Sequence, residues 1–477
     1  MSKNIRSVNR MRNLKKIFKD VRTYFMILLA VPIVWLIYQI VRYRILPTRY
    51  IVIIAALLLI LFILMALMQY KSKKKPVKII GKVIIILLCI VLFIGNYTYM
   101  QTVGVFGNVS TTEDTDVVSV VVLKYRYYEY IEDLKGKEFS ALATSDEHVD
   151  NMLSTIKATN GETPNVRRYS GVLTWVNALY SGEVSCLVMN ESYRSIIEDD
   201  YEKFSDETRV IYSKNYVTEV DTTTNTDLTK NTFSVYISGI DTYGTISTKS
   251  RSDVNMIVTV NPNTKQILLT SIPRDYYIPF NVLGGERDKL THSGLYGVEE
   301  TKGNVENYFG VNIDYYVRVN FTSLIDIVDA IGGIEVDNPR AFGEFSQGTI
   351  HLNGTQALAF SRERHAFAEG DKERGRNQMR VITGIINKVI SPSIITNYMS
   401  LLNSLHSSFQ TNLTDDQMIS LLRMQINDMS AWNIESISVD GNGNTLYSPI
   451  YGSSLYMMVP DDASVETAKQ KINQLYQ

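Results

Sequence analysis

The sequence predicts a membrane-anchored α/β protein, on three observations. Three long apolar segments lie within the first 100 residues. After them, short apolar runs rich in Val and Ile alternate with segments whose apolar residues recur at helical spacing. A polar, Thr- and Asn-rich stretch at 218–232 divides this part in two. We therefore expect three transmembrane helices with a basic tail (1–100), a small accessory α/β domain (101–220), and a second α/β domain with a central sheet flanked by helices and a C-terminal extension (221–477).

The three apolar segments are close to the length that crosses a bilayer. They are Tyr24–Val41, Tyr50–Met68 and Ile79–Tyr97. Three segments in succession, with no small-residue cleavage site, argue against a cleaved signal peptide. A buried helical hairpin of a soluble protein is the alternative.

Basic residues predict the orientation of these segments, because positively charged flanks face the cytoplasm. Residues 71–78, between the second and third segments, are rich in lysine. Arg42, Arg44 and Arg49 in the outer loop oppose this orientation but are fewer. We expect a multi-pass protein of the cell membrane, with its N-terminus inside and everything after Met100 outside. The basic residues before the first segment are Lys3, Arg6, Arg10, Arg12, Lys15, Lys16, Lys19 and Arg22.

Composition excludes several kinds of site. Of the two cysteines, Cys89 lies in the third apolar segment and Cys186 stands alone in the exterior part, so that part has no disulfide framework and no cysteine-based zinc site. Scarce cysteine suits a Gram-positive cell surface. Five histidines without tight spacing argue against other histidine-rich metal sites. The basic tail is too short for a DNA-binding unit and is explained by membrane orientation, so we expect no nucleic-acid partner.

Local patterns predict the elements of both exterior domains. In the accessory domain they are strands at 117–123 and 184–190 and helices at 147–158 and 173–182. Nothing there looks catalytic; the tyrosines at 125, 127, 128 and 130 either stack on sugar rings or simply pack. In the second domain they are neighbouring strands at 233–241, 251–261 and 266–275, then a helix at 304–309, a strand at 314–319, a helix at 321–333, a strand at 334–336 and a short helix at 353–364.

The segment 360–380 is rich in arginine and carries interspersed carboxylates. Downstream apolar residues recur at helical spacing up to Ile390, which predicts an amphipathic helix with one buried face. Arg374 and Gln378 fall on that face, whereas Arg376 and Arg380 fall on the opposite one. A guanidinium on a buried face requires a carboxylate or a bound anion. The alternative is a solvated, self-neutralising surface helix.

The motifs YISGID, RSD, SIPRD, DAIGGIEV, SRER and GDKERGRNQMR follow one another between Phe233 and about Val389, roughly a third of the chain. In this order they resemble the LytR-CpsA-Psr family. The three-span anchor and the extra exterior domain are similar to its capsule-associated branch. The resemblance implies an enzyme that works outside the membrane and moves a completed glycan polymer from a polyprenyl-pyrophosphate carrier onto peptidoglycan.

The resemblance also implies roles for individual residues. Arginines grip phosphates in bidentate fashion, and Mg²⁺ prefers hard oxygen ligands. Asp241 and Asp253 match the family's Mg²⁺ ligands. Arg274 and Asp371 are the expected catalytic residues, Asp371 orienting either an arginine or the acceptor hydroxyl. Asn377 departs from the family, many of whose members carry arginine there. The residues expected around the pyrophosphate are Arg251, Arg274, Arg362, Arg364, Arg374 and Gln378.

Each residue also has a purely structural explanation. Asp241 could be a turn former, and Arg274 could pair with Asp275. Arg362 and Arg364 could be exposed, Arg364 pairing with Glu363 or Asp371.

The sequence thus predicts a magnesium-dependent cell-wall glycan transferase that releases polyprenyl phosphate, with capsule assembly proteins as further partners. It leaves open whether the new link is a phosphodiester or a glycosidic bond. The alternatives are a non-catalytic regulator or scaffold of polysaccharide assembly, and a lipid-linked pyrophosphatase.

Overall fold

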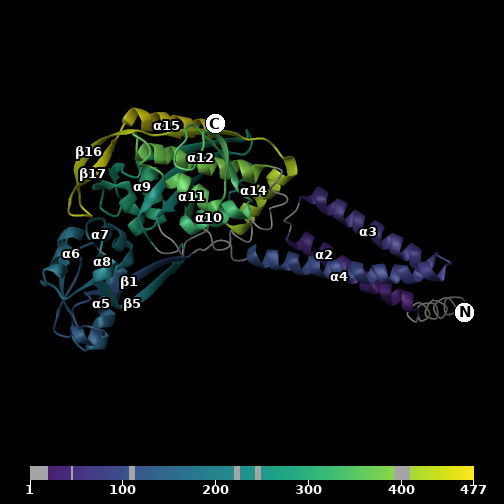
Figure 1. Ribbon diagram of the computed structural model, residues 1–477, viewed down its shortest axis with the longest axis horizontal. Coiled ribbons are helices and arrows are strands. Elements are labelled where there is room, and N and C mark those ends of the chain that lie inside the picture. The colour runs from purple at the N-terminus through teal and green to yellow at the C-terminus, as the bar shows by residue number, and fades with distance from the viewer. Residues whose placement is uncertain are drawn as a thin grey trace, which may run out of the picture. The chain divides into compact units, whose positions relative to one another are not determined.

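The computed structural model describes residues 20–43, 47–106, 113–144, 146–219, 226–241, 246, 249–391 and 409–477. The chain forms two compact units. The first comprises 1–108 with 419–429, and the second 109–418 with 430–477 (Figure 1). The basic residues expected between Lys3 and Lys19, and Arg44, lie outside the described residues.

Three helices form the described N-terminal part of the first unit: α2 (Val21–Tyr43), α3 (Thr48–Tyr70) and α4 (Lys75–Phe106). All three are long and apolar enough to cross a membrane, α4 over Lys75–Met100. Each contains one predicted apolar segment and extends beyond it, because the flanking polar residues continue the helix. The prediction of three apolar N-terminal helices is confirmed, whereas their orientation stays a prediction.

Pro32 interrupts the hydrogen bonding of α2, and α4 compensates for it. Proline has no N–H, so the carbonyl of Leu28 loses its usual helical partner. The Cys89 thiol donates to that carbonyl at 3.5 Å. The Asn96 amide donates to the Pro32 carbonyl at 3.1 Å. The Cys89 thiol of α4 therefore contacts the carbonyl that the proline leaves open, and Asn96 adds a second hydrogen bond between α4 and α2.

The accessory part of the second unit is built on a five-stranded sheet of order β3-β2-β4-β1-β5. The predicted elements at 117–123, 147–158, 173–182 and 184–190 are present, whereas β2, β3 and β5 were not predicted. Thr218 and Glu219, expected in a linker, instead pair with β1. The elements are β1 (Glu113–Leu123), β2 (Glu138–Leu142), α5 (Glu147–Asn160), β3 (Asn165–Tyr169), α6 (Val172–Tyr180), β4 (Cys186–Asn190), α7 (Arg194–Asp200), α8 (Phe204–Glu207) and β5 (Thr208–Glu219), with 3₁₀ turns at Ile131–Leu134 and Glu191–Tyr193.

The central sheet has six strands in the order β14-β11-β6-β7-β8-β15. As predicted, β6, β7 and β8 are neighbours, each antiparallel to the next. β11 joins β6, and β15 joins β8, both in parallel. The C-terminal extension therefore supplies two strands of this sheet, which the sequence did not predict. The strands are β6 (Phe233–Ile240), β7 (Ser252–Asn261), β8 (Gln266–Ile272), β11 (Tyr315–Val319), β14 (Gln410–Thr411) and β15 (Asn433–Ser438).

Helices cover both faces of this sheet. Successive residues of a strand point to opposite faces. Ser271 of β8 lies against Gly375 of α12, whereas Leu268 and Ile272 share a core with Ile472 of α15. The remaining elements are β9 (Tyr277–Pro279), β10 (Arg287–Lys289), a 3₁₀ segment (Leu290–Tyr296), α9 (Val298–Phe309), α10 (Phe321–Ala330), β12 (Ile334–Asn338), β13 (Gly348–Leu352), α11 (Gly354–Arg362), α12 (Asp371–Ile390), α14 (Asp415–Asp428), β16 (Gly441–Ser448), β17 (Ser453–Pro460) and α15 (Asp462–Leu475).

The accessory and central sheets share one hydrophobic core. Trp175 and Leu187 of the accessory part belong to the same cluster of buried side chains as Tyr236 and Leu268 of the central sheet. Their backbones also meet, because the N–H of Val172 donates to the Ile450 carbonyl at 3.3 Å. The accessory part is thus packed into the second unit.

Candidate active site: an arginine-lined cavity with an apolar wall

A cavity of about 700 Å³ lies at one edge of the central sheet. Its lining comes from the ends of β6, β7 and β8, from the 3₁₀ segment, from α10, α11 and α12, and from α7 of the accessory part. Every residue predicted to bind pyrophosphate or metal lines it. They are Asp241, Arg251, Asp253, Arg274, Arg362, Arg364, Arg374 and Gln378.

Strand direction explains why residues far apart in sequence meet here. β6, β7 and β8 alternate in direction, so the end of β6, the start of β7 and the end of β8 share one edge. Asp241 follows β6, Asp253 is the second residue of β7, and Arg274 follows β8 after Pro273. The structure thus brings together three groups that the sequence placed at strand ends.

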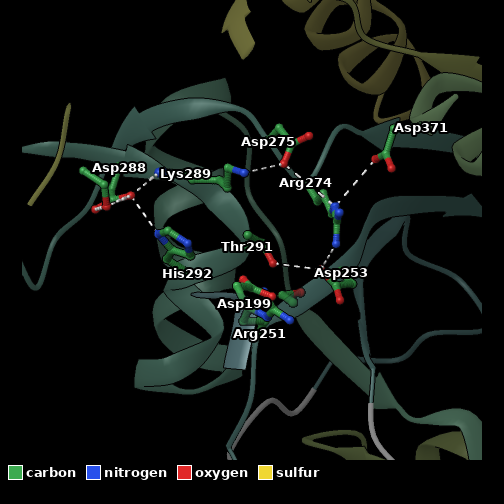
Figure 2. A network of polar contacts seen from close by, with 12 residues as sticks. Asp199, Arg251, Asp253, Arg274, Asp275, Asp288, Lys289, Thr291, His292 and Asp371 are labelled. Carbon is green, nitrogen blue, oxygen red and sulfur yellow. Dashed lines mark hydrogen bonds and ion pairs between the residues drawn. The ribbon is translucent and has the colours of Figure 1, made fainter. Parts of the chain in front are cut away.

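Arg274 is surrounded by three carboxylates (Figure 2). Its Nη1 is 2.8 Å from Asp253 Oδ1, and its Nε is 3.6 Å from Asp371 and 3.8 Å from Asp275. Burial would raise the pKa of Asp253, but the charges of Arg274 and Arg251 outweigh it and hold that pKa below its usual value. The sequence also allowed a purely structural role for Arg274, as the partner of Asp275. That contact, at 3.8 Å, is the longest of the three.

Arg374 lies beside Arg274. Its side chain is only 12% exposed, and its Nη2 is 2.8 Å from Asp371 Oδ2. Burial, and then the like charge of Arg274, lower the pKa of Arg374. Burial alone would lower the pKa of Arg274 as well, but the charges of Asp253, Asp371 and Asp275 raise it. The lowered pKa of Arg374 therefore favours a bound anion, which would offset burial and the like charge beside it.

Asp241 faces the same cavity with its side chain 44% exposed. Burial, and then the negative charge of Asp253, raise the pKa of Asp241. Arg362 lies 3.8 Å from it and over the ring of Phe321, 4.2 Å from the ring centroid. A carboxylate whose pKa is raised beside a second carboxylate fits a divalent cation, which would take its further ligands from phosphate oxygens and water. Within the described residues no group of three or more His, Cys, Asp or Glu residues could hold a metal alone.

The two remaining arginines differ in their partners. Arg251 is paired, at 2.5 Å, with Asp199 of α7, so the accessory part contributes directly to the cavity wall. Nothing in the sequence signalled this contact, because 52 residues separate the pair. Arg364 is exposed, and its Nε lies 3.3 Å from His365. Its suggested pairing with Glu363 or Asp371 is not among the contacts of the described residues.

Asp371 contacts Arg274 and Arg374 but does not line the larger cavity. It lines a second cavity of about 440 Å³, which borders the first along Asp253, Arg274 and Arg374. Asp371 therefore contacts both central arginines from the side of this second cavity.

The other face of α12 carries a second arginine cluster, centred on Glu373. Only 2% of the Glu373 side chain is exposed. It accepts hydrogen bonds from Arg376 at 2.6 Å, Arg380 at 2.7 Å and Arg340 at 3.2 Å. Arg376 and Arg380 do not line the larger cavity. Glu373 and Asn377 are also buried and lie at helical spacing with Val381, so the buried face of α12 carries polar residues that the sequence did not predict to be buried.

Asn377 stands where many members of the family carry arginine. It is fully buried, and its side-chain oxygen accepts from Arg380 at 2.6 Å. In this chain the position therefore belongs to the Glu373 cluster, and Asn377 does not line the larger cavity.

One wall of the larger cavity is apolar. The charged end carries Arg274 and Arg374, whereas other lining residues come from α10, α11 and the middle of α12. These apolar lining residues include Phe321, Leu324, Leu358, Val381 and Ile382. A cavity with a guanidinium end and an apolar wall suits a ligand that combines a phosphate group with an aliphatic chain.

Comparison with known proteins agrees with the resemblance seen in the motifs. A model of the LytR_cpsA_psr family matches residues 196–474. The polyisoprenyl-teichoic acid–peptidoglycan teichoic acid transferase TagU of Bacillus anthracis is 37% identical over 236 residues, 48% of this chain and 75% of that protein. Its namesake in Enterococcus faecalis is 39% identical over 197 residues, 40% of this chain and 64% of that protein. The crystal structure of TagV from B. subtilis matches with 28% identity and a TM-score of 0.45, over 52% of this chain and 98% of that one. The family match spans more than half of the chain, which therefore belongs to the LytR-CpsA-Psr family.

Proposed function

We propose that this protein transfers a glycan polymer from a polyprenyl-pyrophosphate carrier to a sugar hydroxyl of peptidoglycan, and releases polyprenyl phosphate. The observation that carries the proposal is the pair of largely buried arginines, Arg274 and Arg374, the second with a lowered pKa, in a cavity with an apolar wall. The names of the relatives support the same reaction class, since they describe the transfer of a polyisoprenyl-linked polymer to peptidoglycan.

The cavity residues have distinct tasks in this reaction. Arg274 and Arg374 bind the pyrophosphate, and Arg251, Arg362, Arg364 and Gln378 surround it. Phosphoryl transfer depends mainly on positioning and on neutralising charge, which planar guanidiniums do well. As the acceptor oxygen attacks, negative charge grows on the leaving polyprenyl phosphate, and the central arginines stabilise it.

Magnesium is part of the proposal. Asp241 and Asp253 would hold the ion, and their mutual repulsion supports this assignment. When bound, Mg²⁺ supplies charge neutralisation on the phosphate oxygens. Asp371 holds Arg374 at 2.8 Å and keeps its guanidinium in place.

We propose a capsular or another secreted polysaccharide as the polymer, with capsule assembly proteins as partners. The support is the part of the chain that the family match does not cover. The match begins at residue 196, so the three apolar helices and most of the accessory part lie outside it. The cavity faces the outside of the cell in this proposal, where peptidoglycan lies.

The test uses the full-length protein in liposomes, a polyprenyl-pyrophosphate-linked oligosaccharide as donor and soluble peptidoglycan oligosaccharides as acceptor. We expect acceptor-dependent release of polyprenyl phosphate and attachment of the donor sugar to the acceptor. Equal release without acceptor would instead indicate a pyrophosphatase. No release under either condition, with magnesium present, would indicate a non-catalytic role.

A further inference from the structure

A buried aspartate–histidine pair adjoins the cavity. Asp288 of β10 is completely buried, and its Oδ1 is 2.9 Å from Nδ1 of His292. Figure 2 shows this pair together with Thr291, whose hydroxyl donates to Asp253 at 3.0 Å. His292 directly follows Thr291 in the chain, so the Asp288–His292 pair adjoins the network in which Asp253 holds Arg274.

Asp288 is fixed from several directions. The Ser448 hydroxyl donates to Oδ2 at 2.8 Å, and the N–H of Ile450 donates to the same atom at 3.1 Å. Burial alone would raise the pKa of Asp288. The hydrogen bond from His292, the positive charge of the protonated His292 ring and further hydrogen-bond donors outweigh burial, so the pKa is lowered. The group is therefore a carboxylate, which can only accept hydrogen bonds. Nδ1 of His292 consequently carries a proton, and in the neutral ring the lone pair is on Nε2.

His292 lines the 700 Å³ cavity together with Thr291, Arg251 and Arg274. Within the described part of the chain, the ring's recorded hydrogen bond is the one to Asp288 through Nδ1. Nε2 is therefore available to a ligand in the cavity. The arrangement matches the orienting carboxylate and proton-accepting imidazole of general-base sites on unrelated folds.

Two carboxylates of the site are less suited to accept a proton, and the third, Asp241, whose pKa is raised, would be occupied by the metal ion in the proposed function. Asp253 is held by Arg274 at 2.8 Å, and Asp371 by Arg374 at 2.8 Å. An arginine beside a carboxylate favours its ionised form and so weakens it as a base. His292 differs, since the Asp288 carboxylate holds its ring through Nδ1 and leaves Nε2 as the proton acceptor.

We propose that His292 is the general base that takes the proton from the acceptor hydroxyl, and that Asp288 positions it. The proposal rests on the transfer reaction described above. As the proton moves to Nε2, the acceptor oxygen forms a bond to the sugar-linked phosphorus. The bond from that phosphorus to the bridging oxygen breaks, and polyprenyl phosphate departs with the electron pair. The proton on His292 then passes to solvent.

A second pair of the same kind offers a matched control. Nδ1 of His148 is 3.0 Å from Oδ2 of Asp116, which is also buried. Asp116 likewise has further donors, Asn190 at 2.9 Å and Lys249 at 2.7 Å. His148 does not line either of the two cavities described above. A purely structural role would make the two histidines equivalent in their effect on transfer.

The experiment compares His292→Asn and His148→Asn in the full-length protein, with the lipid-linked donor and oligosaccharide acceptor. Asparagine keeps a donor near the position of Nδ1 and removes the base. We expect His292→Asn to lower kcat for transfer by about 100-fold or more, with the melting temperature and the KM for donor unchanged. The wild-type rate should fall on the acidic side as an imidazole protonates, and His292→Asn should lose that dependence. His148→Asn should transfer like the wild type.

The outcomes separate the two proposals. If the wild type transfers the glycan and His292→Asn is equally active, His292 is not the general base, and the transferase proposal stands. A loss of rate that follows a loss of melting temperature, or that leaves the acidic limb unchanged, also overturns the base. If the wild-type protein neither transfers nor cleaves the donor, the transferase proposal fails, and the assignment of His292 as its general base fails too.

Discussion

The two faces of α12 carry two arginine clusters that look alike in sequence and differ in construction. In the Glu373 cluster a buried carboxylate is at the centre, and Arg340 and Arg376 extend outward with side chains 48% and 42% exposed. In the cavity cluster the guanidiniums of Arg274 and Arg374 are central, 21% and 12% exposed. The position of the carboxylate decides whether an arginine cluster is closed or can receive an anion.

The pKa shifts of the central groups express this difference. Burial raises the pKa of Glu373, but the hydrogen bonds from Arg380 and Arg376 outweigh it, so the net shift is downward and the charge is fully compensated. In the cavity cluster, carboxylates raise the pKa of Arg274 despite its burial, whereas burial and the charge of Arg274 lower the pKa of Arg374, so the under-compensated charge is that of Arg374. A buried charge that the protein itself leaves under-compensated is a marker for a ligand of opposite sign.

The largest effect is expected for Arg274→Lys. Lysine keeps the charge but lacks the planar fork that binds two phosphate oxygens at once. We expect transfer to fall by about 100- to 1,000-fold, as for loss of one transition-state donor, with the fold retained. Transfer kinetics and circular dichroism of the full-length protein check this. Arg340→Lys in the Glu373 cluster is the matched control and should transfer at the wild-type rate. Equal rates for the two variants would remove the distinction between the clusters.

A second prediction concerns the carboxylates of the cavity. Asp241→Ala and Asp253→Ala should each lower transfer by about 100-fold, and the double variant should lose little more, because groups that act as one unit are not additive. Release of polyprenyl phosphate is measured with magnesium and with a chelator. Chelation of the wild type should reproduce the same loss. Mild, additive defects that do not depend on magnesium would contradict a shared ion.

Arg374→Gln tests whether the positive charge of Arg374, beside that of Arg274, serves to bind the donor or to stabilise the fold. Removing one of two repelling guanidiniums should weaken donor binding, raising KM by about tenfold, which corresponds to one lost charge-assisted contact. The melting temperature should change little, because loss of the hydrogen bond to Asp371 is offset by removal of the like charge beside Arg274. A clear loss of melting temperature would mean that Arg374 stabilises the fold like the arginines around Glu373.

The smallest effect on transfer, and a clear one on stability, is expected for Glu373→Gln. Losing a buried carboxylate with charge-assisted hydrogen bonds should cost about 2 kcal/mol at neutral pH. Because folding lowers the pKa of Glu373, its stabilisation is complete above the ordinary glutamate pKa of about 4.3 and is lost as the pH falls through the lower value of the folded state. Thermal melting of both proteins from neutral to acidic pH should therefore converge in acid. A constant difference at every pH would assign the effect to packing.

The sequence predicted those parts of the fold and site that depend on local patterns. Alternating and helical periodicity located β6, β7 and β8, and their antiparallel order follows from short connections. β14 has only two residues, and β15 pairs at the sheet edge with a polar sequence, so neither carries a strong strand signal.

Partners distant in sequence could not be predicted from one chain. Asp199 reaches Arg251 across 52 residues, and Ser448 reaches Asp288 across 160. Glu373 gave no signal either, because a glutamate in a mixed charge run is usually solvated. The helical phase nevertheless placed Arg374 and Gln378 on the cavity side of α12.

The segment Ser448–Tyr451 has a consequence for how the protein is made. Its residues bond to Asp288, and its backbone receives the N–H groups of Val172 and Leu173. Ribosomes deliver the accessory sheet and the arginine-bearing strands long before this segment emerges. The accessory part and the cavity wall must therefore wait, incompletely packed, until the last tenth of the polypeptide arrives. A nonsense mutation between codons 375 and 448 would leave every arginine and aspartate of the cavity in the product and still remove the Ser448 and Ile450 donors that hold Asp288 beside His292.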